Sequence, residues 1–376
     1  MRYLTLLVII CISLSCQRKN NDQGSDDFLY SVDTVIIDPK GRLLDLTRYI
    51  EISDLNAEES SIFLYNKFDH SIDEVNLYNL EVTNNYRFDA EGPNGTGEHV
   101  NYLHVLMDDS FFIKSFGESA IFNKNGRLIN RIDWENSIDS NGQLYGQIPR
   151  NEVAISSGNL KVFGLSYDNK NRDVFLDVFS IKENTVKRFD IDSEKSYHNF
   201  VLTIDDPQSD TFLDPLVHLK SENNFIIISH EFSNEIILFN SEGEYVKNVN
   251  YDNNLTPKRV KDLNGISMGS FEQLQKEYQH FLEQVRFGPP VWDRVKKRYL
   301  RLSVVTIFHE RRPEDSFLPE IEEVNVYLSV FDADFNLISE AAIPELYGYG
   351  KYFAKDGKLW VFQNLSDELG FIVIDV

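Results

Sequence analysis

Cysteine is almost absent from this sequence. Of the 376 residues only Cys11 and Cys16 are cysteines, and both lie near the N-terminus. The chain after Cys16 therefore lacks the thiols that a disulfide, a thiolate metal site or a cysteine nucleophile would need. Stability must come from a packed core, which a chain of about 350 residues is long enough to bury.

Basic charge is also scarce. There are 37 lysines and arginines against 60 aspartates and glutamates, which gives a formal net charge of −23. Such a negative field repels a phosphate backbone, so the composition argues against nucleic-acid binding. Zinc-ligand spacing among the eight histidines and a Gly-x-Ser-x-Gly serine elbow are missing as well.

The N-terminus has the pattern of a signal peptide. Met1-Arg2 is positively charged, residues 3–14 are nearly all apolar, and the small residue Ser15 stands directly before Cys16. A short membrane helix or a buried strand is the alternative, but a spanning helix needs about 20 apolar residues. We expect residues 1–15 to be removed and Cys16 to be lipidated.

Lipidation would place the protein at the bacterial cell envelope, in the outer membrane. Several acyl chains on one cysteine hold a protein firmly at a bilayer. Residues 16–27 are polar after Cys16 and predict a flexible tether between the lipid and a folded domain at 28–376.

Short β-type runs separated by Asn, Asp, Gly and Ser fill this domain. The 27 Phe, 18 Tyr and 3 Trp residues suit packed sheets, and the spacing favours a sandwich, a barrel or a propeller. An internal repeat favours the propeller among these folds, because a strand, a tight turn and a second strand recur along the chain. Clear copies of the first strand and its turn are Ala120–Gly126, Ile236–Gly243 and Leu328–Asp334, and looser strand copies are Val75–Tyr78 and Phe175–Phe179.

Five units have four strands each, and a sixth unit is divided between the chain ends. The C-terminal unit stops without a fourth strand after Phe371–Asp375, whereas Asp33–Ile37 has no local partner. Pairing the two would close a ring and remove two exposed sheet edges. The sequence thus predicts an all-β, six-bladed β-propeller closed by an N-terminal strand. One helical insertion is expected at about 270–287, with Ser270 and Gln273 as its capping box.

The layout resembles the six-bladed propeller lipoproteins of Bacteroidota, in particular a family catalogued as a domain of unknown function. The resemblance covers nearly the whole chain. It rests on Cys16, the glycine-rich loop Glu91–Gly97, Val291–Arg294 leading into Tyr299–Arg301, and the closing Asp356–Phe371. The resemblance implies the fold and an envelope location, and no activity.

Candidate binding residues come from two places. The long links between units would share one face of a propeller, and function tends to lie on such loops. The glycines at 92, 95 and 97 superficially resemble a phosphate loop, but a β run follows them, which favours a link between blades. Lysines and arginines at 294–301 could bind an acidic glycan, a lipid headgroup or an acidic partner, or could balance acidic neighbours. The candidates are Glu91, Asn94, His99, Trp292, Asp293, Arg294, Arg298 and Arg301.

No catalytic residue can be named. The leading expectation is a non-catalytic binding or scaffold propeller that contacts the membrane through its lipid and has an envelope protein or glycan as partner. The alternative is a metal-dependent propeller hydrolase or lyase acting on a small molecule or glycan. No cofactor is expected, although carboxylates meeting in the centre of a propeller could bind calcium.

Overall fold

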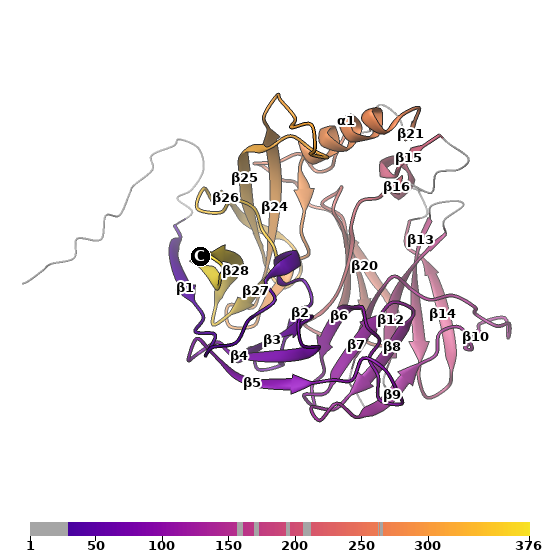
Figure 1. Ribbon diagram of the computed structural model, residues 1–376. Helices are drawn as coiled ribbons and strands as arrows, with labels where there is room; N and C mark the ends of the chain where they lie inside the picture. Colours follow the sequence, from indigo (N-terminus) through magenta and orange to yellow (C-terminus); the bar gives the residue numbers. More distant parts are fainter. Residues whose placement is uncertain are drawn as a thin grey trace, which may run out of the picture.

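The computed structural model describes residues 29–155, 161–168, 173–192, 196–205, 212–261, 263 and 266–376. Within these residues, six small antiparallel sheets succeed one another along the chain and form a six-bladed β-propeller (Figure 1). The expected fold class is confirmed. The signal segment 1–15, Cys16 and the tether 16–27 lie outside the described residues.

In each of the first three blades, the four main strands lie side by side in chain order. Blade 1 consists of β2 (Ser53–Leu55), β3 (Ser61–Asn66), β4 (Ser71–Asn76) and β5 (Glu81–Arg87). Blade 2 consists of β6 (Val100–Val105), β7 (Phe111–Ser115), β8 (Glu118–Phe122) and β9 (Leu128–Ile132). Blade 3 consists of β11 (Asn151–Ile155), β12 (Lys161–Asp168), β13 (Asp173–Ser180) and β14 (Thr185–Asp190), with β10 (Ile138–Asp139) parallel to β14.

The other three blades include one divided inner strand and one strand from the N-terminus. Blade 4 consists of β17 (Val217–Glu222), β18 (Phe225–His230), β19 (Ile236–Asn240) and β20 (Tyr245–Val249). Blade 5 consists of β22 (Arg286–Phe287) and β23 (Val291–Asp293), which both pair with β24 (Arg298–Phe308), then β25 (Ile321–Phe331) and β26 (Leu337–Ala342). Blade 6 consists of β27 (Tyr352–Lys355), β28 (Lys358–Leu365), β29 (Glu368–Asp375) and β1 (Ser31–Ile36).

Strand β1 closes the ring. It pairs antiparallel with β29 over six residues, and Val35 lies opposite Phe371. Just beyond β1, Ile37 donates its N–H to Leu369 O at 2.8 Å and is 1% exposed. The predicted pairing of the orphan strand with the last strand is confirmed.

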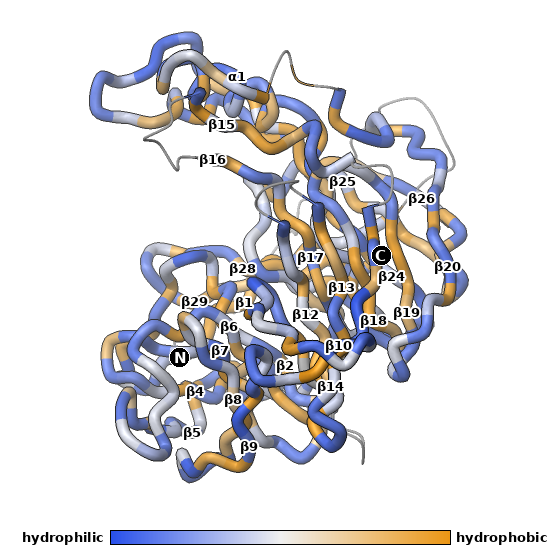
Figure 2. Tube along the Cα trace, turned by 90° about the vertical axis from the view of Figure 1, so that its right-hand side faces the viewer, coloured by the Kyte–Doolittle hydropathy of each residue, from blue (hydrophilic) through white to orange (hydrophobic). Residues whose placement is uncertain are grey.

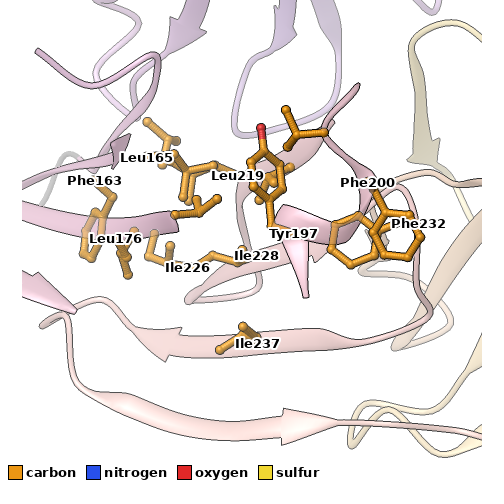
Figure 3. Packing of buried hydrophobic residues seen from close by; sticks show 14 of the residues in the cluster. Phe163, Leu165, Leu176, Tyr197, Phe200, Leu219, Ile226, Ile228, Phe232 and Ile237 are labelled. Carbon is orange, nitrogen blue, oxygen red and sulfur yellow. The ribbon is translucent and has the colours of Figure 1, made fainter. Parts of the chain in front are cut away.

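Burial falls from the middle of each blade toward its rim. All six residues of β3 are buried, whereas Val82 alone is buried in the outer strand β5. A strand between two neighbouring blades is covered on both faces, so it reads as a continuous apolar run. Figure 3 shows such packing between blades 3 and 4, where Phe163 and Leu176 lie in the same cluster as Ile226 and Ile228.

The link between blades 3 and 4 and the link between blades 4 and 5 meet in a small layer outside the ring. It contains β15 (Leu202–Ile204), β16 (Phe212–Leu213), β21 (Ser267–Met268) and α1 (Phe271–Leu282), which lie together in Figure 1. Within the part of the chain that the structure describes, two short 3₁₀ helices also occur, η1 (Thr47–Ile50) and η2 (Tyr197–Phe200). In Figure 2 this layer mixes hydrophilic and hydrophobic positions, whereas blade strands such as β18 and β19 show long hydrophobic stretches.

Helix α1 begins where the sequence predicts. The Ser270 side chain accepts a hydrogen bond from Gln273 N at 3.3 Å, and Gln273 Oε1 accepts from Gly269 N at 2.9 Å. Its apolar side buries Leu274, Phe281 and Leu282. Among the described residues, no helix has the length and apolar character needed to cross a bilayer.

Candidate functional site

The inner strands bring a group of ionisable side chains to the axis of the propeller. Strands β2, β6 and β17 and the residue directly before β27 each contribute to it, so the group draws on four different blades. We call this group the axial cluster. Its members are Asp54, His104, Lys220, Glu222 and Lys351.

Asp54 and His104 form the tightest contact in the axial cluster. The Asp54 Oδ2 atom lies 2.5 Å from His104 Nδ1 and also accepts a hydrogen bond from Val105 N at 3.0 Å. Burial disfavours the charged carboxylate, but the field and hydrogen bond of His104, together with Lys351 and Lys220, outweigh it. They hold the pKa of Asp54 well below its usual value. Asp54 is therefore a fixed negative charge on the axis.

Glu222 and Lys351 both titrate close to neutrality. Burial raises the pKa of Glu222 to about 7, and Lys220 opposes that shift only partly. Burial also lowers the pKa of Lys351 to about 7, with Lys220 as the next cause. Because each group changes charge in the physiological range, the net charge of the axial cluster can respond to whatever binds there.

A second ion pair lies at the end of the axis where the first two strands of each blade are joined. Arg294, in the β23–β24 turn of blade 5, reaches Glu59 in the β2–β3 turn of blade 1 with Nε 3.1 Å from the carboxylate. Its guanidinium also donates to Ala57 O at 3.2 Å and to Glu58 O. Burial raises the pKa of Glu59 to about 7, against the effect of Arg294. Arg294 thus ties blade 5 to blade 1.

The candidate residues at 292–301, which we call the basic segment, have partners within the protein. Asp293 is 1% exposed, and its carboxylate accepts from Arg298 Nε at 3.0 Å, while Trp292 packs on Tyr299 with ring centroids 4.7 Å apart. Arg301 is also 1% exposed, so its side chain lies in the interior and has no access to a surface ligand. The basic segment is therefore divided between the surface and the core.

The candidates in the glycine-rich link lie at the opposite end of the blade strands. The Asn94 side chain accepts a hydrogen bond from Leu128 N at 3.1 Å, and Gly97, with φ +86°, has no room for a Cβ beside Ser115. Glu91 and His99 are exposed. The loop has the close packing expected of a link between blades, and the structure does not bring its residues to Arg294 or Arg298.

His99 borders a cavity of about 420 Å³ between blades 1 and 2. The cavity has an apolar floor from Ile52, Leu64 and Val100, and Phe116 stands at its edge. Both acidic and basic side chains line the cavity. The roles of Glu91, Asn94 and His99 in binding stay predictions.

The axial cluster was missed by the sequence analysis, although one signal for it exists. Val217–Glu222 alternates apolar and polar side chains, so His218, Lys220 and Glu222 share one side of an inner strand. The other members show no such alternation, since Asp54 and His104 stand on strands without it and Lys351 directly precedes β27. Among the described residues, no group of three or more His, Asp or Glu side chains is arranged to hold a metal ion.

Comparisons with known proteins agree with this architecture. Residues 25–342 match the family described as "Domain of unknown function (DUF4221)". The fold is similar to the crystal structure of a DUF4221 member from Bacteroides vulgatus ATCC 8482. The TM-score is 0.64 at 14% sequence identity, over 92% of this chain and 98% of that one.

Weaker likenesses extend to other solved structures. A Bacteroides fragilis NCTC 9343 protein described as exported gives a TM-score of 0.49 at 8% identity, over 92% of this chain and 95% of that one. The β-propeller domain of Swd1 from Myceliophteria thermophila gives 0.39 at 8% identity, over 87% of this chain and 96% of that one. No curated protein matches the sequence. The chain belongs to the DUF4221 family and folds as a six-bladed β-propeller.

Proposed function

We propose that this protein is a binding propeller of the bacterial cell envelope, anchored through lipid on Cys16, and that the axial cluster is its ligand site. One observation carries the binding proposal. Five ionisable side chains from four blades converge on the axis, at positions that the fold could fill with apolar residues.

Burying a charged side chain costs free energy. Apolar side chains at the same positions would avoid that cost if the positions served the fold alone. Ionisable groups taken out of water lose hydration, and the fold recovers that loss only when partners satisfy them. Asp54 has such partners in His104 and Val105 N. Glu222 accepts a hydrogen bond from the backbone of Trp292, and Lys351 donates one to Ser53 O, yet burial still displaces both pKa values to about 7. Such displaced values are typical of groups at binding sites, where a ligand is a further partner. A small polar ligand on the axis would be that partner.

The Asp54→Asn variant tests the ligand site. The amide keeps the shape of the carboxylate but removes the fixed negative charge, so the axial ligand should be held at least tenfold more weakly. We would extract small molecules from protein purified out of its native host and quantify them by mass spectrometry. Wild type should carry a compound that Asp54→Asn lacks.

Two further variants make this test decisive. Asp38→Asn alters an exposed aspartate whose side chain is 56% accessible, and it should retain the compound. His104→Gln places an amide beside Asp54 and should also lose it, which gives a second result if Asp54→Asn folds poorly. Equal compound contents in wild type and both axial variants would remove the axial cluster as the site.

The Cys16→Ala variant tests the anchor. Without the lipid-bearing cysteine, the protein should move almost completely from the membrane fraction to the soluble fraction, because the tether is polar. Cys11→Ala is the matched control, since Cys11 lies in the segment expected to be removed, and it should stay membrane-bound. Persistence of Cys16→Ala in membranes after a carbonate wash would contradict lipid anchoring.

A further inference from the structure

We infer that the cavity between blades 1 and 2 is a second binding site, which takes one uncharged sugar ring. This inference goes beyond the axial cluster and does not rest on it, because the two sites share no residue. Strands β2 and β3 of blade 1 lie beside β6 of blade 2 (Figure 1), and the cavity of about 420 Å³ is lined by both blades and by the links that precede them. Pockets for small ligands typically measure about 300–1,000 Å³.

Phe116 is the clearest sign of a ligand at this cavity. Ser115 pairs with Glu118, so Phe116 and Gly117 alone form the tight turn between β7 and β8. The Phe116 side chain lines the cavity and yet is 89% exposed. Tight turns usually carry Gly, Pro, Asn, Asp or Ser, and an apolar ring in water contributes nothing to closing them. A flat ring held on a short hairpin beside a cavity offers a stacking surface to the apolar face of a ligand.

Asn101 reaches the cavity through an irregularity in β6. Val100 lies opposite Ser115 and Tyr102 lies opposite Lys114, so Asn101 is an extra residue in the strand, a β-bulge. Bulges re-aim a side chain and are frequent next to active sites. Asn101 is exposed and lines the cavity, and none of the described residues hydrogen-bonds its side chain. Its amide is therefore free to donate to and accept from a ligand hydroxyl.

The link that leads into blade 1 brings a strained turn to the cavity. Arg48, Tyr49 and Ile50 have φ of 53°, 54° and 52°. Residues other than glycine seldom adopt this left-handed conformation, because it crowds Cβ against the following carbonyl oxygen. Hydrogen bonds hold the turn, from Glu51 N to Arg48 O at 3.0 Å and from Ser53 Oγ to Ile50 O at 2.5 Å. Arg48 and Ile50 both line the cavity, and strain of this kind is concentrated at functional sites.

The charges around the cavity favour an uncharged ligand. The lining side chains that are charged at neutral pH are Asp45 and Glu98, which are acidic, and Arg48 and Lys67, which are basic. Their formal charges cancel. Lys67 Nζ also lies 3.8 Å from Asp45 Oδ2, and the Arg48 guanidinium lies 3.6 Å from Glu51. The lining as a whole therefore attracts neither an anion nor a cation.

The uncharged part of the lining requires a ligand with two kinds of surface. The apolar floor and the Phe116 ring match C–H groups, whereas Thr47, Asn101 and His99 offer hydrogen bonds. A purely apolar ligand would leave those polar groups without a partner, and a purely polar ligand would leave the floor in water. A sugar ring combines a face of C–H groups with hydroxyls around its edge and carries no charge. It meets both requirements.

Saturation-transfer NMR titrations of the purified protein at pH 7 test the inference with glucose, galactose, mannose and N-acetylglucosamine. Cyclohexanol serves as an apolar probe and sodium acetate as a charged one. We expect at least one of the sugars to bind wild type, and Phe116→Leu to weaken that binding tenfold or more. Leucine keeps the apolar character of the position but lacks a flat ring, whereas Phe116→Trp keeps the ring and should retain binding within twofold.

Further variants separate the site from general effects. Tyr347→Ala is the matched control, because Tyr347 is an aromatic residue that is 80% exposed and does not line the cavity. It should change the dissociation constant less than twofold. Asn101→Ala should weaken binding threefold or more. Phe116 and Asn101 are both exposed, so the melting temperatures of all these variants should match wild type.

Failure of all four sugars to bind wild type would overturn the inference, and so would a Phe116→Leu variant that binds the sugar as wild type does. Binding of cyclohexanol in place of the sugars would assign an apolar ligand, and binding of acetate in their place a charged one. Either result would also overturn it. The Asp54→Asn extraction is a separate measurement, so the proposed function can fail while this inference stands, and the reverse.

Discussion

Removing residues 28–38 should lower the free energy of unfolding of the whole propeller by about 3–5 kcal/mol, although only one short strand is lost. Strand β1 forms the fourth strand of blade 6, and without it the backbone of β29 becomes an open edge. Ile37 is buried and Val35 packs against the same cluster, and each such side chain is worth roughly 1.5–3 kcal/mol. The free energy of unfolding of a typical protein is about 5–15 kcal/mol in total.

Urea denaturation of chains that begin at residue 28 and at residue 39 measures this effect. A chain that begins at residue 28 lacks only the tether and should unfold as the full mature protein does. A chain that begins at residue 39 should unfold at clearly lower urea concentration. If the two midpoints coincide, strand β1 does not hold the ring closed.

Arg301→Met should destabilise the protein by about 3–5 kcal/mol without involving the axial cluster. The guanidinium is buried between blades 4 and 5, where it donates to Gly288 O at 2.7 Å, Asn234 O at 2.8 Å and Tyr251 Oη at 3.2 Å. It also reaches the carbonyl oxygens of His230 and Ser233, each at 3.3 Å. Methionine would leave these acceptors buried without a donor, and each unsatisfied group costs about 1–3 kcal/mol.

Arg131→Met serves as the matched control for Arg301→Met. Arg131 lies on the outer strand β9, and its side chain is 39% accessible and pairs with Glu118. Exposed pairs contribute about 0–1 kcal/mol, so the melting temperature should hardly change. Comparable melting temperatures for the two variants would contradict the structural role of Arg301.

The ring closure could be predicted from sequence because two incomplete features complement each other. Asp33–Ile37 is a strand without a local partner, and the C-terminal unit lacks a strand. Backbone groups must be satisfied somewhere, so the pairing follows from the chain alone. Helix α1 could be predicted for a similar reason, because Ser270, Gln273 and the apolar periodicity of its positions all lie within one short segment.

The candidate site could not be predicted in the same way. Asp54, His104 and Lys351 are far apart along the chain, and only the ring brings them together. The basic residues of 294–301 are separated for the opposite reason. They are close in sequence but divided between the β23–β24 turn and strand β24, so Arg294 reaches the β2–β3 turn while Arg301 enters the core.

The pairing of β1 with β29 also fixes the order in which the molecule can be assembled. Blades 1 to 5 are each built from consecutive strands, so each can form as soon as its own segment is available. Blade 6 joins Ser31–Ile36 to Glu368–Asp375, the two ends of the described chain. A chain that emerges from its N-terminus must keep its first strand unpaired until its last residues arrive. Completion of the ring is therefore a late, long-range step, of the kind that slows folding and exposes an edge to misassembly.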